Sequence, residues 1–155
     1  MTSEDSLDVR EVIFINERCR VDYESMPMDV RESADQAVDA LQNARPLPAK
    51  LCQPLHAKLS GIAEIRLAHD DNTYRVYVTL KCPWIIMVLD AGIKKSTEGK
   101  NIPSWQKERL EMRYKKAREY WTAHDADLKS DYDLDHPSRH RPAHRRERDL
   151  FDVGR

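Results

Sequence analysis

The stretch EIRLAHDDNTYRVYV, residues 64–78, consists of two β-prone segments joined by the polar turn HDDN. Apolar and polar residues alternate on both sides of the turn, which is the period-two pattern of a strand. We expect strands over residues 62–68 and 73–80, and a third over residues 84–90, which is apolar on both faces. Their short connections favour consecutive antiparallel pairing in one sheet.

Helical segments surround these strands. The sequence predicts an edge strand over residues 11–15, a helix over about 17–24, and a second helix over residues 29–44 with apolar residues at helical spacing. Either Pro27 or Asp29 opens this second helix, and Asp29 is a good N-cap with Glu32 three residues later. Residues between this helix and the first strand of the sheet read as a loop.

A third helix is expected from about Ser104 to Trp121, since its apolar residues form one stripe. The order of strand, two helices, three strands and helix predicts an α+β fold, with the N-terminal helices on one face of an antiparallel sheet. We expect residues 11–121 to form the domain, residues 1–10 to be a flexible N-terminus and residues 122–155 to be a charged, flexible tail.

Composition narrows the class of protein. The 155 residues are 34% charged, yet the net charge is only −1, so the whole chain gives no argument for nucleic acid or membrane. The charge is unevenly placed, with a net of −7 over residues 1–43 and +5 over residues 93–121. Three widely spaced cysteines, an acidic N-terminus and short apolar runs predict a soluble cytoplasmic protein.

Alternation along the strands predicts a polar face. Apolar residues of the first two strands should pack under the helices, and the opposite face should form a concave polar patch. That patch would hold Glu64, Arg66, Arg75, Tyr77 and Thr79, with Lys94 and Lys95 at the end of the third strand. Arginine grips a phosphate bidentately and tyrosine stacks on bases, so the set suits a phosphodiester. Solvated or salt-bridged arginines are the alternative explanation.

The same region resembles the RelE/ParE toxin superfamily, and most of all its HigB-type, phage-derived branch. The resemblance covers about residues 11–121, and its most specific part is the order and spacing of three short motifs. The motifs are LSGIAEIR at residues 59–66, YRVYV at 74–78 and IKK at 93–95, followed by Pro103 and the basic KKAREYW at 115–121. Gly92 stands where this branch commonly has phenylalanine.

The resemblance implies a small RelE-like fold and ribosome-dependent cleavage of mRNA. In such toxins the 2′-OH of the RNA attacks the scissile phosphate without a metal or cofactor. Carried over, Arg75 holds the scissile phosphate, Lys94 and Lys95 stabilise transition-state charge or protonate the leaving oxygen, and Arg66 and Tyr77 position the nucleotide.

Glu64 joins this RNA-binding set as the one carboxylate on the face, and the general base stays unassigned. The implied partners are mRNA, the ribosome and a HigA-like antitoxin with a helix-turn-helix domain, with DNA reached only through the antitoxin and no membrane involved. Two alternatives stay open: a ParE-like toxin that binds DNA gyrase and cuts nothing, and an inactive phage-derived accessory protein. The joint presence of the two arginines and two lysines favours the nuclease.

Overall fold

A five-stranded sheet forms the middle layer of the protein in the computed structural model, which describes residues 10–94 and 102–135. The strand order is β1-β5-β4-β3-β2. The strands are β1 (Glu11–Phe14), β2 (Cys52–Pro54), β3 (Ala63–His69), β4 (Asn72–Thr79) and β5 (Ile85–Lys94). The three consecutive strands β3, β4 and β5 pair antiparallel, as predicted, whereas the edge strand β1 lies parallel to β5 and makes the sheet mixed.

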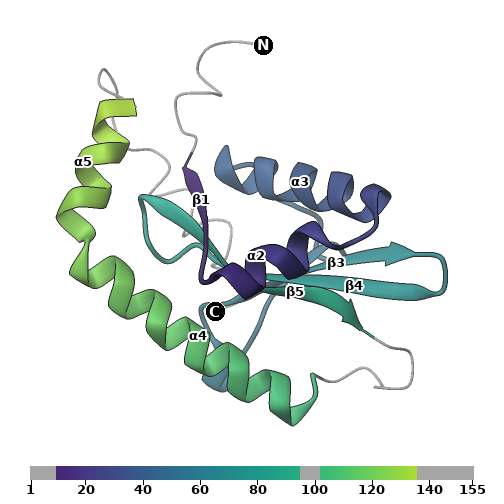
Figure 1. Cartoon of the computed structure of the whole chain (residues 1–155). Helices are drawn as coiled ribbons and strands as arrows, with labels where there is room; N and C mark the ends of the chain where they lie inside the picture. Colours follow the sequence, from purple (N-terminus) through teal and green to yellow (C-terminus); the bar gives the residue numbers. More distant parts are fainter. Residues whose placement is uncertain (1–9, 95–101, 136–155) are drawn as a thin grey trace.

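Helices cover both faces of this sheet, and the α+β class is confirmed (Figure 1). The helices α2 (Glu17–Glu24) and α3 (Met28–Gln42) lie on one face. The long α4 (Ser104–Ala123) and the shorter α5 (Asp125–Asp135) lie on the other. None of the helices in the described ranges is long and apolar enough to cross a membrane.

The core under α2 and α3 follows the predicted alternation. Ala63 and Ile65 on β3 lie opposite Val78 and Val76 on β4, and all four are buried in one cluster with residues of the two helices. Full burial of a valine, leucine or isoleucine side chain contributes about 1.5–3 kcal/mol to the stability of the fold. This burial fixes the register, because a slip by one residue would bring the polar set to this face.

Two local predictions are wrong in the first half of the chain. Pro27, not Asp29, precedes the first turn of α3, and no side chain caps this helix. Proline already has a backbone suited to a helix start, so the helix begins one residue earlier and Asp29 lies in the first turn, where it still favours the dipole. The expected loop over residues 45–58 contains β2 and the start of a short 3-10 helix, η1 (Ala57–Leu59).

The segment after Trp121 differs most from expectation. Residues 125–135 form α5 and do not belong to a flexible tail, because Leu128 and Tyr132 bury their side chains against the sheet. The indole nitrogen of Trp84 donates a hydrogen bond to Asp125 at 2.9 Å, and its ring lies 5.6 Å from that of Tyr132. Weak local propensity is overridden by these tertiary contacts.

The prediction that residues 1–10 form a flexible N-terminus is wrong for Arg10, since it is fully buried and donates hydrogen bonds to the carbonyls of Leu80 and Cys82. Residues 1–9 and 136–155 lie outside the described residues.

Candidate functional site

Two rows of residues cross β3, β4 and β5 on the face opposite α2 and α3. The first row is Glu64, Tyr77 and Asp90, and the second is Arg66, Arg75 and Gly92. The predicted grouping of the two arginines with Glu64 and Tyr77 is therefore confirmed. The predicted openness is wrong for most of the set, because Glu64, Arg75, Tyr77 and Thr79 are all buried. Helix α4 packs over this face and contacts Tyr77.

Glu64 is the centre of the first row. Its Oε1 accepts a hydrogen bond from Arg66 Nε at 2.6 Å, and its Oε2 accepts one from the Tyr77 hydroxyl at 2.9 Å. Arg75 Nη1 lies 3.2 Å from the same Oε2. Both carboxylate oxygens thus face donors, and two of these donors are cations. The geometry makes Glu64 the group that orients both arginines, with neither of its oxygens left without a donor.

Tyr77 is fully buried between the sheet and α4, so its ring offers no surface for a base to stack on. The direct nucleotide contact predicted for it does not fit this structure. Burial, and to a lesser extent the Glu64 carboxylate, raise the pKa of its hydroxyl well above the ordinary value. Tyr77 therefore stays a hydrogen-bond donor and helps to hold Glu64 in place.

A cavity of about 230 Å³ opens above the second row. Its polar lining is His56, Glu64, Arg66, Arg75 and Lys107, and its apolar walls come from Leu55, Leu59 and Ile102. Three cations against one carboxylate give this cationic cavity a net charge of +2 with the histidine neutral. An anion is the ligand that this charge favours.

Arg75 has a buried donor that no described residue pairs with. The residue is only 8% exposed, and its Nε is buried without a hydrogen-bond partner anywhere in residues 10–94 and 102–135. A buried donor left unpaired costs about 1–3 kcal/mol. Glu64 engages the guanidinium through Nη1, so the group is held in a fixed orientation at the wall of the cavity.

Two residues of the cavity were not identified from the sequence. His56 precedes η1 in the segment read as a loop, where no motif marks it. Lys107 belongs to the first turns of α4, which the sequence shows only as part of a basic helix. A signal for Lys107 exists in retrospect, because it stands three positions before the buried Leu110 and so lies beside the face packed on the sheet.

The predicted lysine pair is only partly placed. The backbone of Lys94 pairs with Thr73, one row beyond Arg75 and Gly92, while Lys95 lies outside the described residues. Gly92 has a φ of +156°, and a Cβ built on it would meet no atom of the described residues within 4 Å. Gly92 therefore leaves the position opposite Arg75 without a side chain. The catalytic roles of Lys94 and Lys95 stay predictions.

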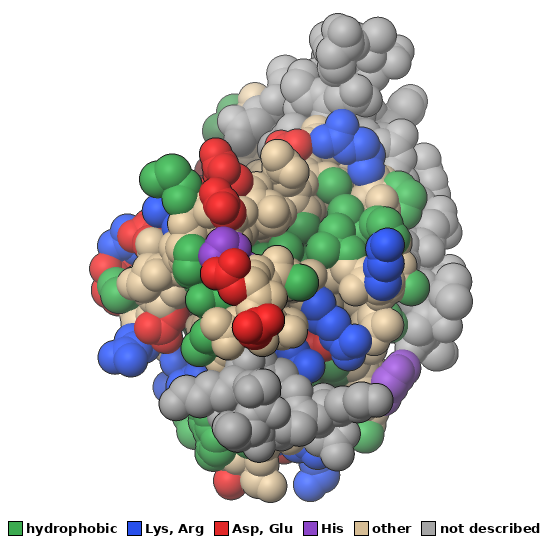
Figure 2. Space-filling view, turned by 90° about the vertical axis from the view of Figure 1, so that its right-hand side faces the viewer, with side chains coloured by type: hydrophobic (Ala, Val, Ile, Leu, Met, Phe, Trp, Pro, Cys, Tyr) green, Lys and Arg blue, Asp and Glu red, His purple; other side chains and the backbone are tan. Residues whose placement is uncertain are grey.

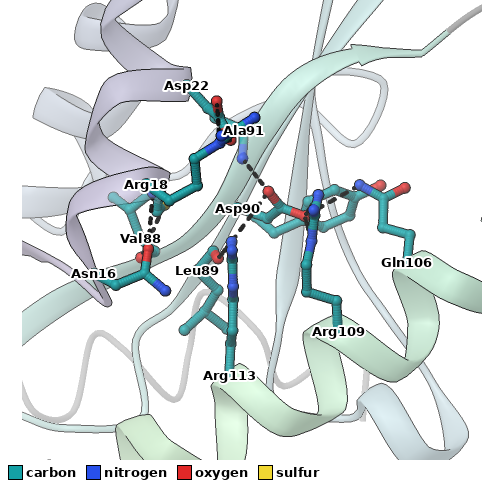
Figure 3. A network of polar contacts seen from close by, with 12 residues as sticks. Asn16, Arg18, Asp22, Val88, Leu89, Asp90, Ala91, Gln106, Arg109 and Arg113 are labelled. Atoms are coloured by element: carbon teal, nitrogen blue, oxygen red, sulfur yellow. Dashed lines mark hydrogen bonds and ion pairs between the residues drawn. The ribbon is translucent and has the colours of Figure 1, made fainter.

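A second buried carboxylate fixes α4 over the site (Figure 3). Asp90 Oδ2 accepts hydrogen bonds from Arg109 Nη2 at 2.7 Å and Nε at 3.1 Å, and from Gln106 at 3.3 Å. Arg113 Nη1 lies 3.3 Å from Asp90 Oδ1 and donates to the Leu89 carbonyl at 2.8 Å. This Asp90 network sets the height and rotation of the helix that carries Lys107.

Irregular strand pairing brings Asp90 to this position. Tyr77 pairs with Asp90 but the next residue, Val78, pairs with Val88, so Leu89 is the extra residue of a bulge. Leu89 then packs in the core under α4 while Asp90 binds the arginines of that helix. Simple alternation from the sequence does not predict this arrangement.

Charge is distributed unevenly over the end of the molecule that carries the β3–β4 hairpin (Figure 2). On this face acidic side chains lie mostly in the left half of the view, and several Lys and Arg side chains lie in the right half. Lys and Arg side chains are also present in the left half, so the right half differs from it mainly in having few acidic side chains.

Comparison with known families gives one match. The model of the family described as Phage derived protein Gp49-like (DUF891) matches residues 22–115. The matched segment includes the whole lining of the cationic cavity and Asp90 with its partners. No curated protein and no solved structure matches the chain.

Proposed function

Since this chain belongs to the Gp49-like family of phage-derived proteins, we propose that it is the toxin of a type II toxin–antitoxin pair and cleaves mRNA on the ribosome. The resemblance to the HigB-type branch supports the finer part of this proposal. The observation that carries it is the cationic cavity, where Glu64 orients Arg66 and Arg75 and the Arg75 Nε has no hydrogen-bond partner among the described residues.

Arg75 and Arg66 would bind the scissile phosphate, with Lys107 adding positive charge from α4. The 2′-oxygen of the preceding ribose attacks phosphorus, and the bond from phosphorus to the 5′-oxygen breaks. The products are a 2′,3′-cyclic phosphate and a 5′-hydroxyl. Charge that develops on the phosphoryl oxygens in the transition state is stabilised by guanidinium groups already held in place by Glu64, so little reorganisation is needed.

Proton transfer requires a base for the 2′-hydroxyl and an acid for the leaving oxygen. Glu64 is a poor candidate, because each of its oxygens already faces an arginine. His56 is an exposed imidazole at the rim of the same cavity, and imidazole is the side chain most often used for this task. We assign proton transfer to His56, with Lys94 and Lys95 as further candidates for charge stabilisation.

The antitoxin and the RNA would use different surfaces. Helices α2 and α3 contain more acids than bases, whereas the cavity and α4 are basic, so RNA is repelled from the former and attracted to the latter. A HigA-like antitoxin with a helix-turn-helix domain would bind in the cytoplasm, and DNA would be contacted only through that complex.

Induced expression of the wild type and of Arg75→Ala, with growth recorded and mRNA 5′ ends mapped, tests the proposal. We expect growth arrest and new cuts within translated frames for the wild type, both lost in Arg75→Ala. Arg45→Ala is the matched control, because Arg45 makes an exposed ion pair with Asp39 away from the cavity. Arrest with intact mRNA would favour the gyrase-binding alternative, and unimpaired growth would favour an inactive accessory protein.

A further inference from the structure

Trp105 is an exposed aromatic side chain beside the site. It lies in the first turn of α4 and is 55% exposed, whereas Trp84 is buried and Trp121 is partly buried against the core. Tryptophan normally covers much of its large apolar surface. The residues directly before and after it, Ser104 and Gln106, are polar.

A fixed cation accompanies this ring. The Arg109 guanidinium lies over Trp105, with its carbon 4.9 Å from the ring centroid. Two hydrogen bonds to the buried Asp90 hold that guanidinium in place. The ring and the guanidinium therefore form a preorganised pair, which we name the Trp105–Arg109 platform. Pairs of this kind attract flat, electron-rich partners close to negative charge.

The platform and the cationic cavity lie on neighbouring rows of the sheet. Arg75 in the cavity faces Gly92 across the β4–β5 pair, and Asp90, which holds Arg109, precedes Gly92 by two residues. Two residues along a strand span about 7 Å. Within the described part of the chain no atom would contact a Cβ at Gly92, the residue that lies between the two on β5 and has no side chain of its own.

We propose that the Trp105–Arg109 platform binds an unpaired nucleobase of the RNA whose phosphate occupies the cationic cavity. This inference rests on the proposed function and adds a base-binding subsite to it. Stacking on an aromatic ring with an adjacent arginine is a general mode of single-strand recognition and tolerates any base. This subsite adds affinity for the RNA and fixes the position of the RNA strand relative to Arg75.

A protein helix is a poorer occupant of this surface. Met112 follows Trp105 by seven residues and is also exposed, so the two share a side of α4. They are about 10 Å apart along the helix axis. The charged Glu108 and Arg109 lie between them on the same side, which leaves no continuous apolar stripe for a partner helix.

Binding of a single-stranded, fully 2′-O-methylated RNA, which cannot be cleaved through a 2′-OH, tests the inference in the full chain. We expect Trp105→Ala to weaken binding by about 5- to 100-fold and Trp105→Phe to weaken it less. Met112→Ala, an exposed residue on the same side of α4, should bind as the wild type does. In Trp105→Ala the slope of the log binding constant against the log salt concentration should stay as in the wild type. In Lys107→Ala the magnitude of this slope should fall by about one.

An abasic scan of the same RNA locates the stacked base. One abasic position should weaken binding to the wild type by the factor lost in Trp105→Ala, and should have no further effect in that variant. Wild-type affinity in Trp105→Ala, or additive effects of protein and RNA changes, would overturn the inference and leave the nuclease proposal intact. If the wild type neither binds this RNA nor cleaves mRNA, the proposed function fails and the inference fails with it.

Discussion

Replacing Asp90 by asparagine removes one negative charge from the point where α4 is fixed to β5. Asp90 is fully buried, and its partner Arg113 has a side chain only 10% exposed. Removing one member of a buried ion pair leaves the other unpaired and costs about 3–5 kcal/mol. Arg109, at 35% exposure, can turn to water, so its share of the loss is no more than about 1 kcal/mol.

Urea unfolding measures this loss directly. For a typical slope of about 1–3 kcal/mol per molar urea, a loss of about 3–5 kcal/mol lowers the midpoint by roughly 1 M or more while the slope stays the same. Asp22→Asn is the matched control, since it breaks the Arg18–Asp22 pair, whose side chains are 77% and 25% exposed (Figure 3). That control should cost less than about 1 kcal/mol.

The double variant Asp90→Asn, Arg113→Met separates the lost pair from a general disturbance of the helix. Methionine carries no charge that needs a partner, so the double variant should be more stable than Asp90→Asn alone. An Asp90→Asn protein that is no less stable than the Asp22→Asn control would refute the reasoning. The reasoning would also be refuted if the losses of unfolding free energy caused by Asp90→Asn and by Arg113→Met were additive in the double variant.

Three further outcomes are expected. Glu64→Gln should lower the free energy of unfolding by about 3–5 kcal/mol and reduce mRNA cleavage, because Arg75 loses its buried partner. A variant that is as stable as the wild type but inactive would instead make Glu64 the general base. Burial raises the pKa of the Cys52 thiol to about 11, so at pH 8 only about one molecule in a thousand carries the thiolate. A thiol reagent should therefore label Cys52 far more slowly in the native protein than in the urea-unfolded chain. Equal labelling rates would contradict the burial of Cys52. Asp125→Ala should lower the free energy of unfolding by about 1 kcal/mol, because the hydrogen bond from Trp84 is lost. Amide hydrogen exchange should become faster in α5 but not in α3. Unchanged exchange in α5 would show that this hydrogen bond does not hold the helix.

The elements that carry a local periodic signal are predictable from this sequence. Alternation around the HDDN turn gives β3 and β4 their partners and faces, and it places Arg66 opposite Arg75. The helix predicted over 17–24 is found at those positions. In each case short-range geometry decides the outcome, because side chains one or two residues apart determine which face is apolar.

The packing of α4 over the polar face could not be predicted in this way, because it depends on tertiary contacts. Alternation shows that Glu64 and Tyr77 share a face, but not that a helix forty residues later lies on them. The bulge at Leu89 and the folding of α5 have the same origin, since both depend on contacts between distant segments. His56 enters the cavity for the same reason.

The buried carboxylates explain why two arginines stand on neighbouring strands of a nearly neutral protein. Side by side, Arg66 and Arg75 would repel each other and turn to solvent, but Glu64 beneath them draws both guanidinium groups to one point. Asp90 does the same for the arginines of α4 one strand away. The entropy of ordering four long side chains is thus lost during folding, so an anion that binds here need not order them. Among the described residues, this fixed positive charge and the unpaired Nε of Arg75 support the proposed phosphate site over a set of solvated arginines.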